Sequence, residues 1–137
     1  MLELTQPIIT PFNERQFREA LSQFATGVTV VTTRLENGEF FGITISSFNS
    51  VSLDPPLVLW SLATKARSLP AFTANAYYVI NVLSADQQAL AERFASRTEN
   101  RFDDLEIELS QTGLPILQAW GMTETSPIAA VCTLSAA

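Results

Sequence analysis

The sequence predicts a small, mainly antiparallel β-barrel with two or three flanking helices. Short runs rich in β-branched and aromatic residues recur along the chain, as strands of such a sheet do. One tight turn signal, Asn37-Gly38, separates two of these runs and predicts a hairpin. Two capping boxes mark the starts of helices. Together these features are typical of a small barrel with helices at its flanks.

Size and composition indicate one globular domain. The chain has 137 residues, and its 47% hydrophobic and 16% charged residues are typical of a packed protein rather than a disordered one. Its net charge is −6 and it has no basic run, so we do not expect a nucleic-acid partner. No apolar run reaches the length of a membrane span and the first residues do not form a signal peptide, so we expect no membrane partner.

The chain has no histidine and a single cysteine, Cys132. This composition excludes a zinc site, Cys/His or Ser/His catalysis and an internal disulfide, so we expect no metal site. A single thiol favours a reducing cytoplasm. The chemistry must therefore be modest or carried by a bound cofactor.

The N-terminal part predicts a lead-in followed by one helix. Residues 1–12 are expected to be an extended segment. Asn13 is a good N-cap with Gln16 three residues later, and Gly27 is expected to end the helix. Helical spacing predicts an inward apolar face made of Phe17, Leu21 and Phe24.

Four segments predict the central strands. Residues 28–33 and 39–47 are expected to pair antiparallel across the Asn37-Gly38 turn. Residues 57–62 follow Asp54-Pro55-Pro56 and predict a second buried strand, and residues 77–83 predict a third core strand.

Helices and one further strand complete the expected elements. A short helix is predicted within residues 65–72, starting near Ser68 and Pro70. The capping box at 84–87 opens a helix from about 85 to 95, with Leu90 and Phe94 facing inward. A short strand is expected around 105–109.

The stretch from 43 to 53 combines apolar and hydroxyl-bearing residues. Its candidate core residues are Ile43, Ile45, Phe48, Val51 and Leu53. The polar ones are Thr44, Ser46, Ser47, Asn49, Ser50 and Ser52. In a strand, Thr44 and Ser46 point to the face opposite Ile43 and Ile45. The polar face is either that of a solvated edge strand or part of a small-ligand site, and both interpretations stay open.

Two later segments carry charge suited to a ligand. Lys65, Arg67 and Ser68 precede a helix start, which favours an anion, although a solvated basic loop is the common alternative. Residues 100–103 form a loop with one aromatic residue, for which a structural anchor is the favoured interpretation. The chain has no carboxylate pair, phosphate-binding Gly-rich loop or GxGxxG motif, so hydrolysis and a Rossmann dinucleotide site are poorly supported.

Five segments resemble the flavin reductase-like family, the small reductase components of two-component flavin-dependent monooxygenases. They are "FREALSQFATGVTVVTT", "GITISSFNSVSLDPPLVLWSL", "KARSLPAF", "YYVINVLSADQQALAERFAS" and "NRFDD", and the resemblance covers roughly residues 13 to 117. It implies an FMN-binding split β-barrel, usually a homodimer. It also implies that NADH or NADPH reduces FMN or FAD, which then diffuses to a partner monooxygenase. The choice within each pair of nucleotides is left open.

The resemblance also implies which residues bind flavin. Thr44, Ser46 and Ser47 match positions that contact the ring edge or the ribityl and phosphate groups. Val51 and Ser52 match the turn beside the isoalloxazine. The segment that holds the phosphate end is matched by Ser61, Ala63, Lys65, Arg67 and Ser68. Arg101 and Phe102 match a loop that borders the flavin. The family needs no catalytic side chain, because hydride passes directly from nicotinamide C4 to flavin N5.

The last segment departs from the family pattern. We divide the chain into an N-terminal extension (1–12), a flavin reductase-like domain (13–118) and a foreign-looking tail (119–137). The tail contains Gly-Met-Thr-Glu-Thr, which resembles a motif of AMP-forming acyl-CoA ligases, but the other ligase motifs are missing and ligase activity is not expected. We therefore expect a barrel incomplete at its C-terminus.

The departure at the tail leaves other outcomes open. "IAAVCTL" (128–134) is a hypothetical strand that could cover an open edge of the incomplete barrel. The alternatives to a working reductase are a flavin-binding module without turnover and a nonfunctional truncated product.

Overall fold

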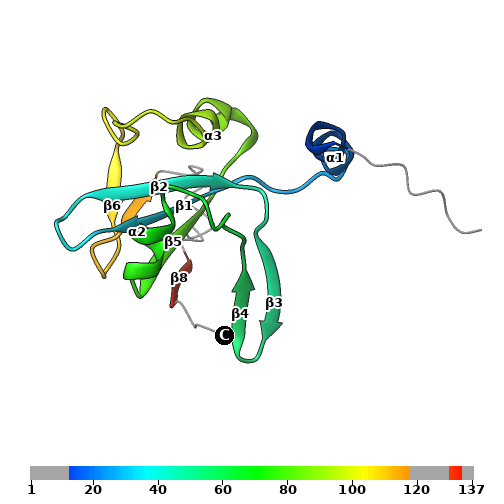
Figure 1. The fold of residues 1–137 in the computed structure, drawn as a ribbon. Helices are drawn as coiled ribbons and strands as arrows, with labels where there is room; N and C mark the ends of the chain where they lie inside the picture. Colours follow the sequence, from blue (N-terminus) through cyan, green and yellow to red (C-terminus); the bar gives the residue numbers. More distant parts are fainter. Residues whose placement is uncertain (1–12, 118–129, 134–137) are drawn as a thin grey trace, which may run out of the picture.

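The computed structural model describes residues 13–117 and 130–133. The expected lead-in at 1–12 and most of the tail at 119–137 lie outside these residues. Within them, an antiparallel four-stranded sheet runs in the order β2 (Phe40–Ile45), β1 (Thr29–Arg34), β5 (Tyr77–Val82) and β8 (Ala130–Thr133) (Figure 1). Two separate hairpins pair β3 (Asn49–Leu53) with β4 (Pro56–Leu59) and β6 (Ile107–Leu109) with β7 (Pro115–Leu117). The helices are α1 (Glu14–Leu21), α2 (Leu69–Ala74), the 3-10 helix η1 (Ala85–Gln87) and α3 (Gln88–Ala95).

The hairpin predicted across Asn37-Gly38 is confirmed. β1 and β2 pair antiparallel, with Thr29 opposite Ile45 and Arg34 opposite Phe40. Gly38 has a φ of 89°, a backbone conformation that glycine adopts without steric cost. The turn therefore fixes the register of the two strands.

Alternate residues of β1 point to opposite faces of the sheet, so β1 contributes to one apolar cluster on each face. Val31 joins one apolar cluster with Phe72 of α2 and Ile80 of β5, and Trp60 packs its ring on the same cluster. Val30 joins a second cluster with Phe94 of α3. Helices α2 and α3 therefore lie on opposite faces of the sheet (Figure 1).

A buried asparagine ties three strands together. Asn81 of β5 is 2% exposed, and its amide nitrogen donates to Val30 O at 2.9 Å and to Thr32 Oγ1 at 3.2 Å. Its Oδ1 accepts from Leu117 N at 3.0 Å, while Thr32 Oγ1 donates to Pro115 O. These bonds satisfy polar groups that would otherwise be buried without partners, and they fix β7 against β1 and β5.

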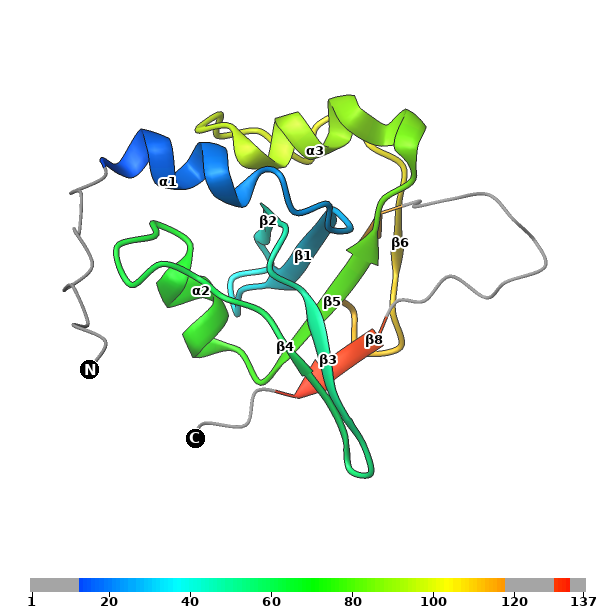
Figure 2. The same cartoon turned by 90° about the vertical axis from the view of Figure 1, so that its right-hand side faces the viewer.

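The strand proposed within 128–134 is confirmed by its backbone pairing. β8 runs antiparallel to β5, with Tyr77 opposite Thr133 and Ile80 opposite Ala130. Figure 2 shows β8, in red, beside β5. The edge of β5 that faces away from β1 is therefore paired.

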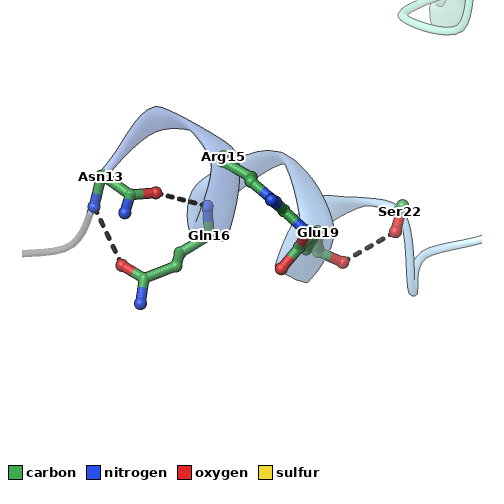
Figure 3. Close-up of polar contacts among 5 residues, drawn as sticks. All are labelled: Asn13, Arg15, Gln16, Glu19 and Ser22. Carbon is green, nitrogen blue, oxygen red and sulfur yellow. Dashed lines mark hydrogen bonds and ion pairs between the residues drawn. The ribbon is translucent and has the colours of Figure 1, made fainter.

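The capping box of α1 is confirmed, but the predicted helix end is wrong. Asn13 Oδ1 accepts from Gln16 N at 2.9 Å, and Gln16 Oε1 accepts from Asn13 N at 3.0 Å (Figure 3). The helix ends at Leu21 rather than at Gly27. After Leu21 the backbone forms turns in which an N–H donates to the carbonyl three residues earlier, as Phe24 N does to Leu21 O. In addition, Ser22 Oγ donates to Glu19 O. These bonds satisfy the last carbonyls of the helix before Gly27 is reached.

The prediction that α1 packs inward is also wrong. Phe17, Leu21 and Phe24 are 49%, 56% and 77% exposed, and no residue of α1 is buried. The helix lies apart from the sheet (Figure 1).

The prediction of a buried strand at 57–62 is confirmed only in part. β4 ends at Leu59, and Leu57 and Leu59 are 44% and 56% exposed. Val58, Trp60 and Leu62 are partly buried and pack against the first apolar cluster. The β3–β4 hairpin projects from the sheet (Figures 1 and 2), which also leaves Val51 and Leu53 in solvent. In contrast, Ile43, Ile45 and Phe48 do contribute to the core, as expected.

The remaining elements agree with the sequence predictions. α2 follows Ser68, and β6 lies within the segment expected to form a strand. The capping box between Ser84 and Gln87 is present, with Phe94 of α3 buried. Ser84 Oγ also donates to Asp86, and this bond holds the pKa of the Asp86 carboxyl below its ordinary value. None of the described helices has the length and apolar character needed to cross a bilayer.

Candidate functional site

A cavity of about 790 Å³ lies at the outer edge of β2. β2 ends the four-stranded sheet, so within the described residues only β1 pairs with it. Three segments line the cavity: residues 39–43 at the start of β2, residues 65–68 before α2, and residues 94–102 at the end of α3 and after it. Because α2 and α3 cover opposite faces of the sheet, their adjoining loops meet at this edge.

Gly42 lets α3 approach β2 closely beside the cavity. A Cβ atom at this position would lie 2.5 Å from Cε1 of Phe94, so a side chain cannot fit without displacing the ring. Phe102 packs on Phe94 with 5.0 Å between ring centroids and on Phe40 with 5.6 Å. The cavity therefore borders a cluster of three aromatic rings.

The cavity carries an excess of positive charge. Its lining includes four basic side chains (Lys65, Arg67, Arg97 and Arg101) and two acidic ones (Glu39 and Glu99). In the part of the chain that the structure describes, Lys65, Arg67 and Arg97 make no hydrogen bond or ion pair.

Ser68 adds a hydroxyl to this lining. It is 7% exposed, and its hydroxyl makes no cap bond to α2. Cationic side chains without a hydrogen-bond partner among the described residues, lying beside such a hydroxyl, are suited to bind an oxyanion such as phosphate.

Two arginines fasten the loop that forms one wall of the cavity. Arg101 donates from Nη1 to Gly42 O at 2.9 Å and to Phe94 O at 3.5 Å, and from Nε to Thr98 O at 3.0 Å. Arg93 of α3 donates to the carbonyls of Asn100 and Asp103 on the far side of the same loop. Both guanidinium groups are thus bonded to neutral carbonyls, which fixes the loop and leaves their charge uncompensated.

The structure brings together five of the residues that the family resemblance implied. The residues that line the cavity are Lys65, Arg67, Ser68, Arg101 and Phe102. They come from two segments more than thirty positions apart in the sequence, and the fold places them around one space.

The other implied residues lie outside the cavity lining, and their role in binding stays a prediction. Thr44 Oγ1 donates to Ala91 O at 2.6 Å and links β2 to α3. Ser47 Oγ accepts from Ser61 N at 2.9 Å, which joins the segments that follow β2 and β4. The remaining members of this group are Ser46, Val51, Ser52 and Ala63, and all of them except the half-buried Ser52 are exposed.

Sequence reasoning missed most of the cavity lining, including Arg97 and Phe40. The sequence predicts only a polar loop around Arg97 and an ordinary strand position for Phe40. One signal could have found Arg97: it lies between the end of the predicted helix and the loop with Arg101 and Phe102, which were expected to border the flavin. Phe40 gave no signal of its own, because only the fold brings it against Phe102.

Comparison with known proteins agrees with this fold. Residues 21–136 match the family described as flavin reductase like domain, and the chain belongs to that family. The match includes most of the 119–137 segment.

Two curated relatives are similar in sequence. The FMN reductase (NADH) SmoA of Agrobacterium fabrum is 50% identical over 105 residues, covering 77% of this chain and 59% of that one. The reductase subunit HsaB of a flavin-dependent monooxygenase from Rhodococcus jostii is 40% identical over 103 residues, covering 75% of this chain and 52% of that one. The chain thus spans less than two thirds of the length of either relative.

A solved structure shows the same fold. The NADH:FAD oxidoreductase SgcE6 of Streptomyces globisporus, in complex with NAD and FAD fragments, is similar with a TM-score of 0.73 and 35% identity. The similarity covers 82% of this chain and 68% of that one. The mainly β architecture with flanking helices is therefore the flavin reductase fold.

Proposed function

We propose that this protein uses NADH or NADPH to reduce free FMN or FAD and supplies the reduced flavin to a flavin-dependent monooxygenase in the cytoplasm. The observation that carries the proposal is the cation-rich cavity beside three aromatic rings, in a chain of the flavin reductase family. Relatives named as FMN reductase and as a monooxygenase reductase subunit support both the reaction and the partner.

The cavity residues fit a flavin nucleotide. Its phosphate needs cationic and hydroxyl donors, which Lys65, Arg67 and Ser68 offer together on one loop. The flavin ring system needs an apolar surface, which the rings of Phe40 and Phe102 can provide at the cavity. The hydroxyls from Thr44 to Ser52 follow the cavity-lining part of β2 in the sequence and are proposed to meet the rest of the flavin.

The part played by the chain is to bind and position the reactants. Bound flavin supplies the redox chemistry, since its ring accepts the hydride that a nicotinamide donates. Cations on the 65–68 loop hold the phosphate, and the aromatic cluster excludes water from one side of the site. No side chain is required as nucleophile or general base, which agrees with the absence of histidine.

The reductase proposal is tested by following NADH oxidation by the purified protein with and without added FMN. We expect a rate that depends on flavin and saturates with it, and NADPH and FAD in matched assays define the preferred pair. A flavin-dependent rate no higher than the protein-free blank would contradict the proposal. FMN binding without NADH oxidation would instead indicate a flavin-binding module without turnover.

We also propose that the protein forms a homodimer. The support is the exposed apolar surface of α1 and of the β3–β4 hairpin, where Leu53 is 94% exposed. Sedimentation analysis should give twice the chain mass, and Leu53→Glu should shift the equilibrium toward monomer. A monomer at high protein concentration would contradict the dimer without bearing on the reductase reaction.

A further inference from the structure

Two arginines on one wall of the cavity are in different bonding situations. Arg101 has three backbone carbonyls as acceptors, whereas Arg97 lines the same cavity with no hydrogen bond or ion pair among the described residues. A guanidinium that is already bonded to carbonyls holds the loop in place. One without partners is available to a ligand.

We infer that Arg97 binds the phosphate of the nucleotide across the cavity from Lys65 and Arg67, and that Arg101 is a positioning residue rather than a ligand contact. This inference rests on the proposed function and deepens it, because it assigns the two arginines separate roles at the same site. It also revises the role that the family resemblance implied for Arg101.

Position and charge favour Arg97 for the phosphate. Lys65 and Arg67 enter the cavity from the loop before α2, and Arg97 enters from the loop after α3, so a phosphate between the loops meets cations from two directions. Glu39 and Glu99 also line the cavity. The Glu39 carboxylate lies at the hairpin turn, where its Oε2 accepts from Asn37 Nδ2 at 3.4 Å. The remaining positive charge still exceeds the negative, which suits a dianionic phosphate ester.

Geometry favours Arg101 for positioning. Its three acceptors lie on β2, on α3 and within the loop itself, so a single side chain connects all three parts of the wall. A lysine carries the same charge, but its ammonium cannot reproduce the planar fork of a guanidinium. Charge alone therefore does not replace Arg101.

The test compares FMN with riboflavin, which has the same ring system and lacks the phosphate. Dissociation constants are measured by quenching of flavin fluorescence for the wild-type chain and for Arg97→Gln, Arg97→Lys, Arg101→Gln and Arg101→Lys. We expect Arg97→Gln to weaken FMN binding about tenfold and to leave riboflavin binding unchanged, since a charge-assisted hydrogen bond to phosphate is lost. Arg97→Lys should restore most of the FMN affinity.

Arg101 variants should behave differently. Arg101→Gln should weaken FMN and riboflavin by the same factor, and hydrogen exchange of residues 96–102 should rise in the free protein. Arg101→Lys should not rescue either property. If Arg101→Gln does not fold, the lysine variant alone makes the comparison.

Two results would overturn the inference. One is an unchanged FMN-to-riboflavin affinity ratio in Arg97→Gln, and the other is a selective loss of FMN binding in Arg101→Gln. Inorganic pyrophosphate serves as a probe that does not depend on flavin. Pyrophosphate binding that requires Arg97, in a wild-type chain that binds no flavin, would uphold the anion site and reject the proposed function. If the wild-type chain binds neither, both fail.

Discussion

The central sheet with its covering helices and the parts that project from it (α1 with its following turn, and the β3–β4 hairpin) contain similar apolar residues, but these are buried in the first and exposed in the second. Phe94 of α3 is 1% exposed, whereas Phe24 after α1 is 77% exposed. Val30 and Val31 of β1 are fully buried, whereas Leu53 of β3 is almost fully exposed. An apolar pattern therefore predicts that a face avoids water, but it does not say whether the same chain supplies the cover.

The largest expected contrast is between two phenylalanines. Phe94→Ala removes a ring packed on Gly42 and Phe102, and it should lower the free energy of unfolding by about 3–5 kcal/mol. Phe24→Ala is the matched control, with an expected change within about 0.5 kcal/mol in the isolated chain. Chemical denaturation measures both. Equal losses would show that α1 packs on the sheet in solution.

A smaller contrast separates two asparagines. Asn81→Ala removes the side-chain partner of Val30 O and Leu117 N and one of the two partners of Thr32 Oγ1, so it should cost about 2–3 kcal/mol. Asn49→Ala on the exposed hairpin should have little effect, as measured in the same denaturation experiment. A neutral Asn81→Ala would mean that the buried bonds are not formed in solution.

Two glycines give the next comparison. Gly42→Ala places a methyl group against the Phe94 ring and should cost about 1–3 kcal/mol, whereas a Cβ at Gly27 meets nothing within 4 Å. Thermal unfolding should therefore show a lower midpoint for Gly42→Ala alone. Gly27→Ala is the control and should unfold like the wild type. If Gly42→Ala also unfolds like the wild type, α3 does not lie this close to β2.

These contrasts also show what the sequence could predict. Local signals predicted most of the backbone: Asn37-Gly38 set the hairpin and both capping boxes formed, but the helix expected to end at Gly27 ends at Leu21. The other errors concerned burial. Leu57, Leu59 and Phe17 are residue types typical of a core, but whether they are covered depends on contacts that no local pattern encodes.

The candidate site was predictable in part for the same reason. Lys65, Arg67 and Ser68 are adjacent in sequence and stood out as an anion-binding segment. Arg97 and Phe40 did not, because only the packing of α3 on β2 brings them to the same cavity. The resemblance to the family supplied Arg101, and the structure then gave the carbonyls that this side chain holds.

The smallest predicted effect is at the cap of α1. Asn13→Ala removes the acceptor for Gln16 N and should weaken the helix locally by about 1 kcal/mol. Because no residue of α1 is buried, the unfolding of the sheet should not change. Hydrogen exchange within 14–21 should rise while exchange in β1 and β5 stays constant. A lower stability of the whole domain would show that α1 is coupled to the sheet.

The central claim is that the cavity at the outer edge of β2 holds the phosphate end of a flavin. Hydrogen–deuterium exchange of the purified chain with and without saturating FMN tests it directly. We predict protection in residues 39–43, 65–68 and 94–102, with less protection when riboflavin replaces FMN. Protection confined to other segments, with these three unchanged, would contradict the claim.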